Sequence, residues 1–227
     1  MENKYTKIER KLPLIPLRGL AIFPYMILNF DIGREVSLKA LDEAMLADEL
    51  IFLTSQKEAE IDEPTEEDFY HVGTICKVKQ MIKLPGDTVR VLVEGISRGK
   101  IKEVNQDAGY FEAVVDEIIY NETTTQNDIE IEALVRNVLD SFEEYINIGN
   151  RVSPEILVSL EEIENADRFV DTIASNIYLE PEQKQEILEE FDIAKRLELL
   201  YSILLEEIDI LKIEKKIIRV CLWFCMM

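Results

Sequence analysis

The spacing of apolar residues changes near Tyr120, and this change constrains the fold more than any other feature of the chain. Before it, short apolar runs rich in β-branched residues alternate with polar positions and end at turn residues, which is typical of strands. After it, apolar residues recur every three or four positions, as in amphipathic helices. Strands followed by helices predict an α+β chain rather than a series of βαβ units.

The first part of the chain contains one predicted helix among its strands. In Val36–Asp48, apolar residues share one face at helical spacing, which includes Leu38, Leu41 and Met45 and can include Ala44. A single helix among several short strands suggests a strongly bent sheet or a barrel. The predicted strands are 12–17, 25–32, 50–55, 73–83, 88–94, 100–104 and 110–119.

The clearest hairpin of the first part joins residues 74–83 to 88–94 through Leu84-Pro85-Gly86-Asp87. Proline fixes φ at the first central position of a turn, and glycine readily supplies the positive φ needed at the next one. The four residues therefore predict a type II turn.

The second part carries three helix-start signals. Asn127 with Glu130 has the spacing of an N-cap pair, while Ser153-Pro154 and Glu180-Pro181 each place a proline where a first helical turn begins. One long last helix is predicted, because its apolar residues form a continuous stripe. The stripe consists of Ile187, Phe191, Ala194, Leu197, Tyr201, Leu204, Ile208 and Leu211.

Composition argues against several classes of partner. The chain has 227 residues and 47% hydrophobic residues, enough for one or two folded domains. Its net charge of -21 disfavours nucleic acid and anionic membranes, both of which attract clustered cations. No apolar run approaches the roughly 18 residues of a membrane span, and no signal peptide is evident. With three cysteines and no disulfide framework, a cytoplasmic protein is expected.

One catalytic pattern occurs, at Gly95-Ile96-Ser97-Arg98-Gly99. It matches the G-x-S-x-G elbow of α/β-hydrolases, which needs a helix after the serine and a histidine later in the chain. The residues that follow alternate like a strand, and the single histidine, His71, precedes the serine. A kink between strands, bounded by the two glycines, explains the pattern better.

No metal or cofactor site is predicted. His71 and Cys76 are too few to bind zinc, so His71 is expected to be partly buried and Cys76 to be a core residue. The acidic segment 58–69 lacks the ligand spacing and glycine of an EF-hand and is read as a solvated loop. Lys100 is followed by isoleucine, which does not fit a phosphate-binding loop.

Two segments resemble the N-terminal region of the Lon ATP-dependent protease family. The first runs from Leu12 to Ile101 and includes LPLIPLRGLAIFPYMILNFDIGRE and VGTICKVKQMIKLPGDTVRVLVEGISRGKI. The second includes ADRFVDTIASNIYLEPEQKQEILEEFDIAKRLELLYSILLEEIDILKIEKKI, with a D-x-x-x-R-L element at Asp192, Arg196 and Leu197. The resemblance covers about residues 8–217.

The resemblance implies a β-rich, PUA-like domain over 8–120 and a helical domain over 121–217. It also implies that the chain is not an enzyme, because the family's ATPase module and Ser-Lys protease dyad come later than the matched region. The implied function is recognition of unfolded or damaged protein clients and assembly of a homo-oligomer. An adaptor or decoy that binds Lon or clients remains an alternative, and so does a nucleic-acid-binding PUA-like module, which the charge disfavours.

Four residues are candidates for client contact: Phe23, Pro24, Tyr25 and Met26 form a bulky apolar group in a loop that Pro24 marks. Unfolded chains expose apolar side chains and strand edges, so a surface that recognises them should offer the same. Each of the four can equally well belong to the core.

The resemblance fails after Lys216, where residues 218–227 form an apolar tail that ends in CLWFCMM. A truncated or frameshifted gene is the expected explanation, and a short partner-binding tail is the alternative. The tail is too short to span a membrane, and Cys225 lies in the wrong place for prenylation.

Overall fold

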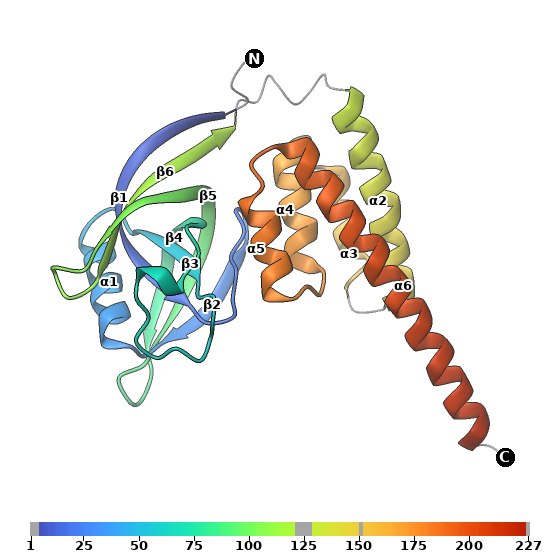
Figure 1. The fold of residues 1–227 in the computed structure, drawn as a ribbon, viewed down its shortest axis with the longest axis horizontal. Helices are drawn as coiled ribbons and strands as arrows, with labels where there is room; N and C mark the ends of the chain where they lie inside the picture. The colour runs from blue at the N-terminus through green and yellow to red at the C-terminus, as the bar shows by residue number, and fades with distance from the viewer. Residues whose placement is uncertain (1–4, 121–128, 150–151, 226–227) are drawn as a thin grey trace. The chain divides into compact units, whose positions relative to one another are not determined.

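The computed structural model describes residues 5–120, 129–149 and 152–225, with side chains described as far as residue 217 (Figure 1). The chain divides into two compact units. The first combines Met1–Asn121 with Tyr178–Glu189, and the second combines Glu122–Ile177 with Glu190–Met227. The first unit thus includes a helix from the second half of the sequence. Whether 8–120 and 121–217 behave as domains stays a prediction.

The first unit is built on a closed sheet. Its strand order is β2-β5-β4-β3-β1-β6, and a further pairing between β5 and β6 closes the last five strands into a barrel. All neighbours pair antiparallel except β1 and β3, which are parallel. The α+β class and the bent, closed sheet are therefore as the sequence predicts. The strands are β1 (Tyr5–Leu17), β2 (Ile27–Ile32), β3 (Leu50–Ser55), β4 (Val72–Lys83), β5 (Val89–Asn105) and β6 (Phe111–Tyr120).

The long strand β5 makes the closure possible. Its first part pairs with β2, from Val89 to Glu94, and its last part pairs with β6, from Arg98 to Asn105. The sequence predicts two strands here, at 88–94 and 100–104, and that division is wrong. β4 pairs with β5 from Val89 to Lys100, across both glycines, with a register shift opposite Ile75 and Cys76. The kink is thus a bulge within one strand.

Helix α1 (Glu35–Leu46) packs on the sheet. The predicted face is confirmed, because Leu41 and Ala44 are buried and Leu38 and Met45 pack against the same core. Cys76 is buried in this core, also as predicted. Burial disfavours the charged thiolate and raises the pKa of Cys76 far above its ordinary value.

The turn between β4 and β5 differs from the prediction in one respect. Gly86 has the predicted positive φ, at 84°. Asp87 also has a positive φ, 56°, and the closing hydrogen bond runs from the Leu84 amide to the Thr88 carbonyl at 2.8 Å. A simple type II turn has only one left-handed residue, so the loop is one residue longer than expected.

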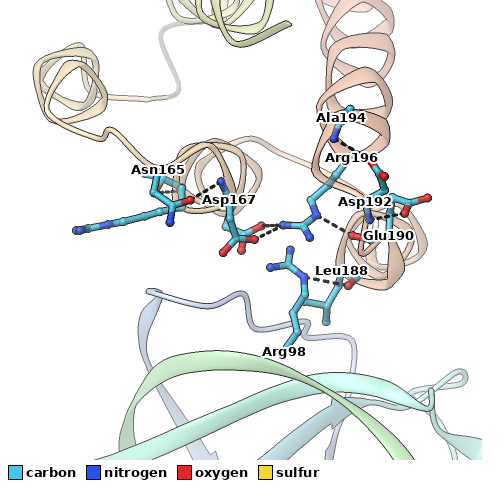
Figure 2. Close-up of polar contacts among 11 residues, drawn as sticks. Arg98, Asn165, Asp167, Leu188, Glu190, Asp192, Ala194 and Arg196 are labelled. Carbon is cyan, nitrogen blue, oxygen red and sulfur yellow. Dashed lines mark hydrogen bonds and ion pairs between the residues drawn. The ribbon is translucent and has the colours of Figure 1, made fainter. Parts of the chain in front are cut away.

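Helix α5 (Pro181–Glu189) belongs to the unit of the sheet. The buried Gln185 side chain donates from Nε2 to the Val72 carbonyl of β4 at 2.9 Å. Arg98, buried in β5, donates from Nε to the Leu188 carbonyl at 3.2 Å (Figure 2). Two polar side chains thus attach α5 to strands about 90 to 110 residues earlier.

The second unit is helical. It contains α2 (Ile129–Gly149), α3 (Glu155–Glu161), α4 (Ala166–Asn176) and α6 (Ile193–Cys225), and α2 packs along α6. α3 begins directly after Ser153-Pro154, as predicted, whereas the predicted cap at Asn127 lies outside the described residues. No helix within the described residues is both long enough and apolar enough to cross a bilayer.

The predicted long helix from Pro181 is wrong in its first third. α5 ends at Glu189 and α6 begins at Ile193. Ile187 therefore lies on α5, Phe191 lies between the two helices, and the stripe residues from Ala194 onward lie on α6. Asp192 marks the new start, because its Oδ1 accepts from the Ala194 amide at 3.0 Å as an N-cap (Figure 2). The stripe on α6 is confirmed as core at Leu197, Leu204 and positions beyond, including Ile208 and Leu211.

A buried ion pair joins α6 to α4. The fully buried Arg196 lies 2.5 Å from Asp167, measured from Nη1 to the carboxylate oxygen (Figure 2). The same nitrogen lies 3.4 Å from a carboxylate oxygen of Asp171. Its Nε donates to the Glu190 carbonyl at 2.8 Å. α4 begins at an Asn165 cap whose side chain accepts from the Asp167 amide. In the D-x-x-x-R-L element, Asp192 therefore caps α6 and Arg196 forms the ion pair with α4.

Candidate functional site

Ser97 has a structural environment. Its hydroxyl donates to Glu117 Oε1 at 2.6 Å, and Arg10 Nε donates to Glu117 Oε2 at 2.5 Å. Glu117 is buried, so these two donors satisfy a carboxylate that would otherwise be costly to bury. The strand continues on both sides of Ser97, whereas a nucleophile elbow needs a helix after the serine.

His71 is exposed, which corrects the expectation of a partly buried histidine. It precedes β4, and its backbone carbonyl accepts from the Ile101 amide at 2.7 Å. Within the described part of the chain, no group of three His, Cys, Asp or Glu residues is placed to hold a metal ion.

The acidic segment 58–69 is more ordered than a plain solvated loop. Thr65 and Asp68 form a capping box around a short 3-10 helix, Glu66–Asp68, and these hydrogen bonds lower the pKa of the Asp68 carboxyl. The loop ends at the buried Phe69. Near its start, the buried Gln56 amide donates to the carbonyls of Glu58 and Ile61 at 3.2 and 3.0 Å.

The four predicted client-binding residues divide into two kinds. Phe23 and Pro24 are buried, and Met26 is half-buried and packs against the core under α1. Tyr25 is 44% exposed. The first two residues therefore support the loop from within, and Tyr25 is the one that the loop presents to solvent.

Strand β5 holds this loop in place. The Tyr25 amide donates to the Gly95 carbonyl at 2.8 Å, and the Gly95 amide donates to the Met26 carbonyl at 2.9 Å. Tyr25 has a φ of 65°, which costs a bulky residue on the order of 1–3 kcal/mol. Such a conformation persists only where the surrounding structure determines it, as these hydrogen bonds do.

β2 continues from the loop as an edge strand. Among the described residues it pairs only with β5, so no second strand pairs with its outer edge. Leu28, Phe30 and Ile32 turn inward, whereas Ile27 is 63% exposed opposite Glu94. Ile96, at the β5 bulge, is also exposed.

The three exposed residues Tyr25, Ile27 and Ile96 of this loop and strand pair are together called the edge surface below. The sequence prediction stopped at Met26 and missed Ile27 and Ile96. For Ile27 a signal existed, because it is an apolar residue in the outward phase of an otherwise alternating strand.

Two adjoining cavities lie at the other end of β2, with volumes of about 480 and 530 Å³. Arg18, which follows β1, and Arg34, which precedes α1, line both of them. Arg18 forms an ion pair with Asp62 at 2.5 Å, and Arg34 Nη2 donates to Gln56 Oε1 at 2.5 Å. Sequence reasoning missed this pair, because the two arginines are 16 positions apart and lie in an acid-rich chain.

Comparison with known proteins shows what this architecture is similar to. Residues 11–206 match the family model described as the ATP-dependent protease La (LON) substrate-binding domain. The chain is 77% identical over 219 residues to the Lon protease of Clostridioides difficile strain 630, and 46% identical over 208 residues to that of Desulforamulus reducens. These matches cover 96% and 92% of this chain but only 28% and 25% of the relatives, so the chain spans about a quarter of their length.

Solved structures show the same fold. The N-terminal domain of a Mycobacterium avium complex Lon protease aligns with a TM-score of 0.67 at 20% identity, over 85% of this chain and 97% of that one. The Lon N-terminal domain protein of Xanthomonas campestris aligns with a TM-score of 0.57 at 16% identity, over 85% and 98%. Since the family model covers most of the chain and the relatives match along it, this chain belongs to the Lon substrate-binding domain family.

Proposed function

We propose that this chain binds unfolded or damaged proteins as the client-recognition part of a Lon-type ATP-dependent protease. The observation that carries the proposal is the edge surface. Exposed Tyr25 and Ile27 stand beside an edge of β2 that no second strand pairs with in the described part of the chain, and unfolded chains expose apolar side chains and unpaired backbone.

The edge surface favours one mode of binding. An extended client segment would add as a further strand along β2, with backbone hydrogen bonds supplying sequence-independent affinity. Tyr25 and Ile27 would add preference for segments with apolar side chains at alternate positions. Affinity from the backbone and preference from a few apolar side chains would suit a protein that must accept many different unfolded sequences.

The other activities of the relatives enter only by family membership. ATP hydrolysis and peptide-bond cleavage would belong to parts of a Lon protease outside this chain, whose own role would be non-catalytic. Assembly into a cytoplasmic homo-oligomer is part of the same proposal.

The test compares one polypeptide in two states. α-Lactalbumin that has been reduced and carbamidomethylated stays unfolded, and its native disulfide-bonded form is the control. We expect the purified chain to bind the unfolded form at least tenfold more tightly in a calorimetric titration. Equal affinity for the two forms would reject client recognition.

A further inference from the structure

The guanidinium of Arg34 is only partly satisfied. Nη2 donates to Gln56, but Nη1 is buried and has no hydrogen-bond partner among the described residues. A buried donor without an acceptor costs free energy, more so when it is charged, and each such group calls for an explanation. Because Arg34 lines both cavities, a ligand bound there could provide the acceptor.

Arg34 is held in a fixed position. Its partner Gln56 is buried, and the Gln56 side-chain nitrogen donates to the carbonyls of Glu58 and Ile61. These hydrogen bonds fix the orientation of the amide, so that its oxygen accepts from Arg34. The Arg34 backbone carbonyl also accepts the Leu38 amide as α1 begins. A fixed guanidinium loses little conformational entropy when it binds a planar acceptor.

The charges around Arg34 limit a bound anion to modest charge, because carboxylates line both cavities together with the two arginines. Burial is the main cause that lowers the pKa of its guanidinium, and the positive charge of Arg18 lowers it further. Asp62 offsets this repulsion, yet it is mostly exposed and pairs with Arg18 at a surface where ion pairs are weak. Residues 35–37 of the α1 N-terminus line the second cavity, and helix N-termini favour anions.

The cavity walls limit which anion fits. Leu17, Leu20 and Phe30 line the first cavity, so a ligand there meets apolar side chains next to the guanidinium. Glu35 and Glu63 line the second, and their charges would repel a phosphate dianion more strongly than a singly charged carboxylate. A carboxylate attached to an apolar group satisfies both conditions, and a guanidinium binds a carboxylate with two parallel hydrogen bonds.

We propose that this arginine cavity binds a carboxylate of a client polypeptide, with Arg34 as the main donor and Arg18 as the second. The inference rests on the proposed function for the identity of the ligand, and it adds a charged subsite to the apolar edge surface. The carboxylate is either the chain terminus or an acidic side chain. In both cases the Asp62 carboxylate would compete with the client carboxylate for Arg18.

The test uses small probes and the whole chain. N-acetyl-L-leucine presents a terminal carboxylate, and N-acetyl-L-aspartic acid α-amide presents a side-chain carboxylate. N-acetyl-L-leucinamide lacks the charge, and inorganic phosphate tests the alternative anion. Amide resonances of residues 18 and 34–37 are followed in nitrogen-edited NMR spectra. We expect saturable, millimolar binding of at least one carboxylate, and the tighter of the two identifies the source.

Three variants make the test specific. Arg34→Gln should weaken carboxylate binding about tenfold or more, because it removes the charged donor. Asp62→Asn should strengthen it, because it removes the competitor. Lys102→Gln, which removes an exposed cation that pairs with Glu9 and Asp116, should leave it unchanged. The dispersion of the spectra reports whether each variant is folded.

The outcomes separate the two proposals. Equal binding of N-acetyl-L-leucinamide, tighter binding of phosphate, or an unchanged affinity in Arg34→Gln or Asp62→Asn would overturn the carboxylate subsite. If small carboxylates bind as expected but unfolded α-lactalbumin does not, client recognition fails while the cavity chemistry stands. If α-lactalbumin binds and the carboxylates do not, only the subsite fails.

Discussion

The carbonyl oxygen of Phe23 lies where a side chain on residue 95 would begin, because a Cβ built on Gly95 would be only 2.3 Å from it. Gly95 is not among the residues with positive φ, so its role is close backbone approach and not an unusual conformation. This approach lets β5 bind the Tyr25 loop through two backbone hydrogen bonds.

Gly95→Ala is therefore expected to destabilise the first unit by about 1–3 kcal/mol, because the new methyl group forces the loop away from β5. Chemical denaturation measures the change. Gly33→Ala is the matched control, since a Cβ there would meet only Thr88 Oγ1 at an ordinary 3.7 Å. If Gly95→Ala unfolds at the same denaturant concentration as the unmodified chain, the close approach is not essential.

Client binding should depend on the edge surface. Replacing both Tyr25 and Ile27 by serine is expected to weaken binding of unfolded α-lactalbumin at least fivefold with little change in thermal midpoint, because both side chains are exposed. Leu46→Ser is the control, since Leu46 is 81% exposed on α1, away from β2 in the sequence. An equal loss of binding in the control would point to general surface hydrophobicity instead.

Met26 is a poorer probe of the same surface. It packs against the core, so Met26→Glu should lower the thermal midpoint by several degrees, whatever it does to binding. Differential scanning calorimetry measures this. A midpoint that does not move would show that Met26 is a surface residue after all.

The buried cation of the second unit should be essential for its stability. Arg196→Met leaves the buried carboxylates of Asp167 and Asp171 without this partner, and breaking such a pair typically costs about 3–5 kcal/mol. Arg136→Met removes an exposed arginine that pairs with Glu132 one turn away, and it should change little. The helical circular dichroism signal during denaturation compares the two. Similar midpoints would mean that Arg196 contributes no more than a surface cation.

Hydrogen exchange should show the attachment of α5. Arg98→Met removes the donor to the Leu188 carbonyl and should speed amide exchange within α5 more than in β3. Lys100→Met, two residues further along β5 and exposed, serves as the comparison. Unchanged exchange in α5 would show that the Gln185 contact to Val72 is sufficient.

The sequence by itself determined the class of fold and most of its elements. Period-two alternation predicted the strands and period-3.6 spacing predicted α1 and the core stripe of α6, because both periodicities are local consequences of backbone geometry. The positive φ of Gly86 was also predictable, because the Pro-Gly sequence of a turn is a local signal. The resemblance to Lon also rested on residues visible in the sequence, and the family match over residues 11–206 confirms it.

Tertiary structure alone decided what distant residues do together. Arg98 and Leu188 are 90 positions apart, and Arg18 and Arg34 share cavities only because β1 ends beside the start of α1. The backbone of the exposed Tyr25 is fixed by a hydrogen bond to Gly95, 70 residues away. Local pattern cannot supply such pairings, because they are fixed by strand register and barrel closure, which are properties of the whole packed chain.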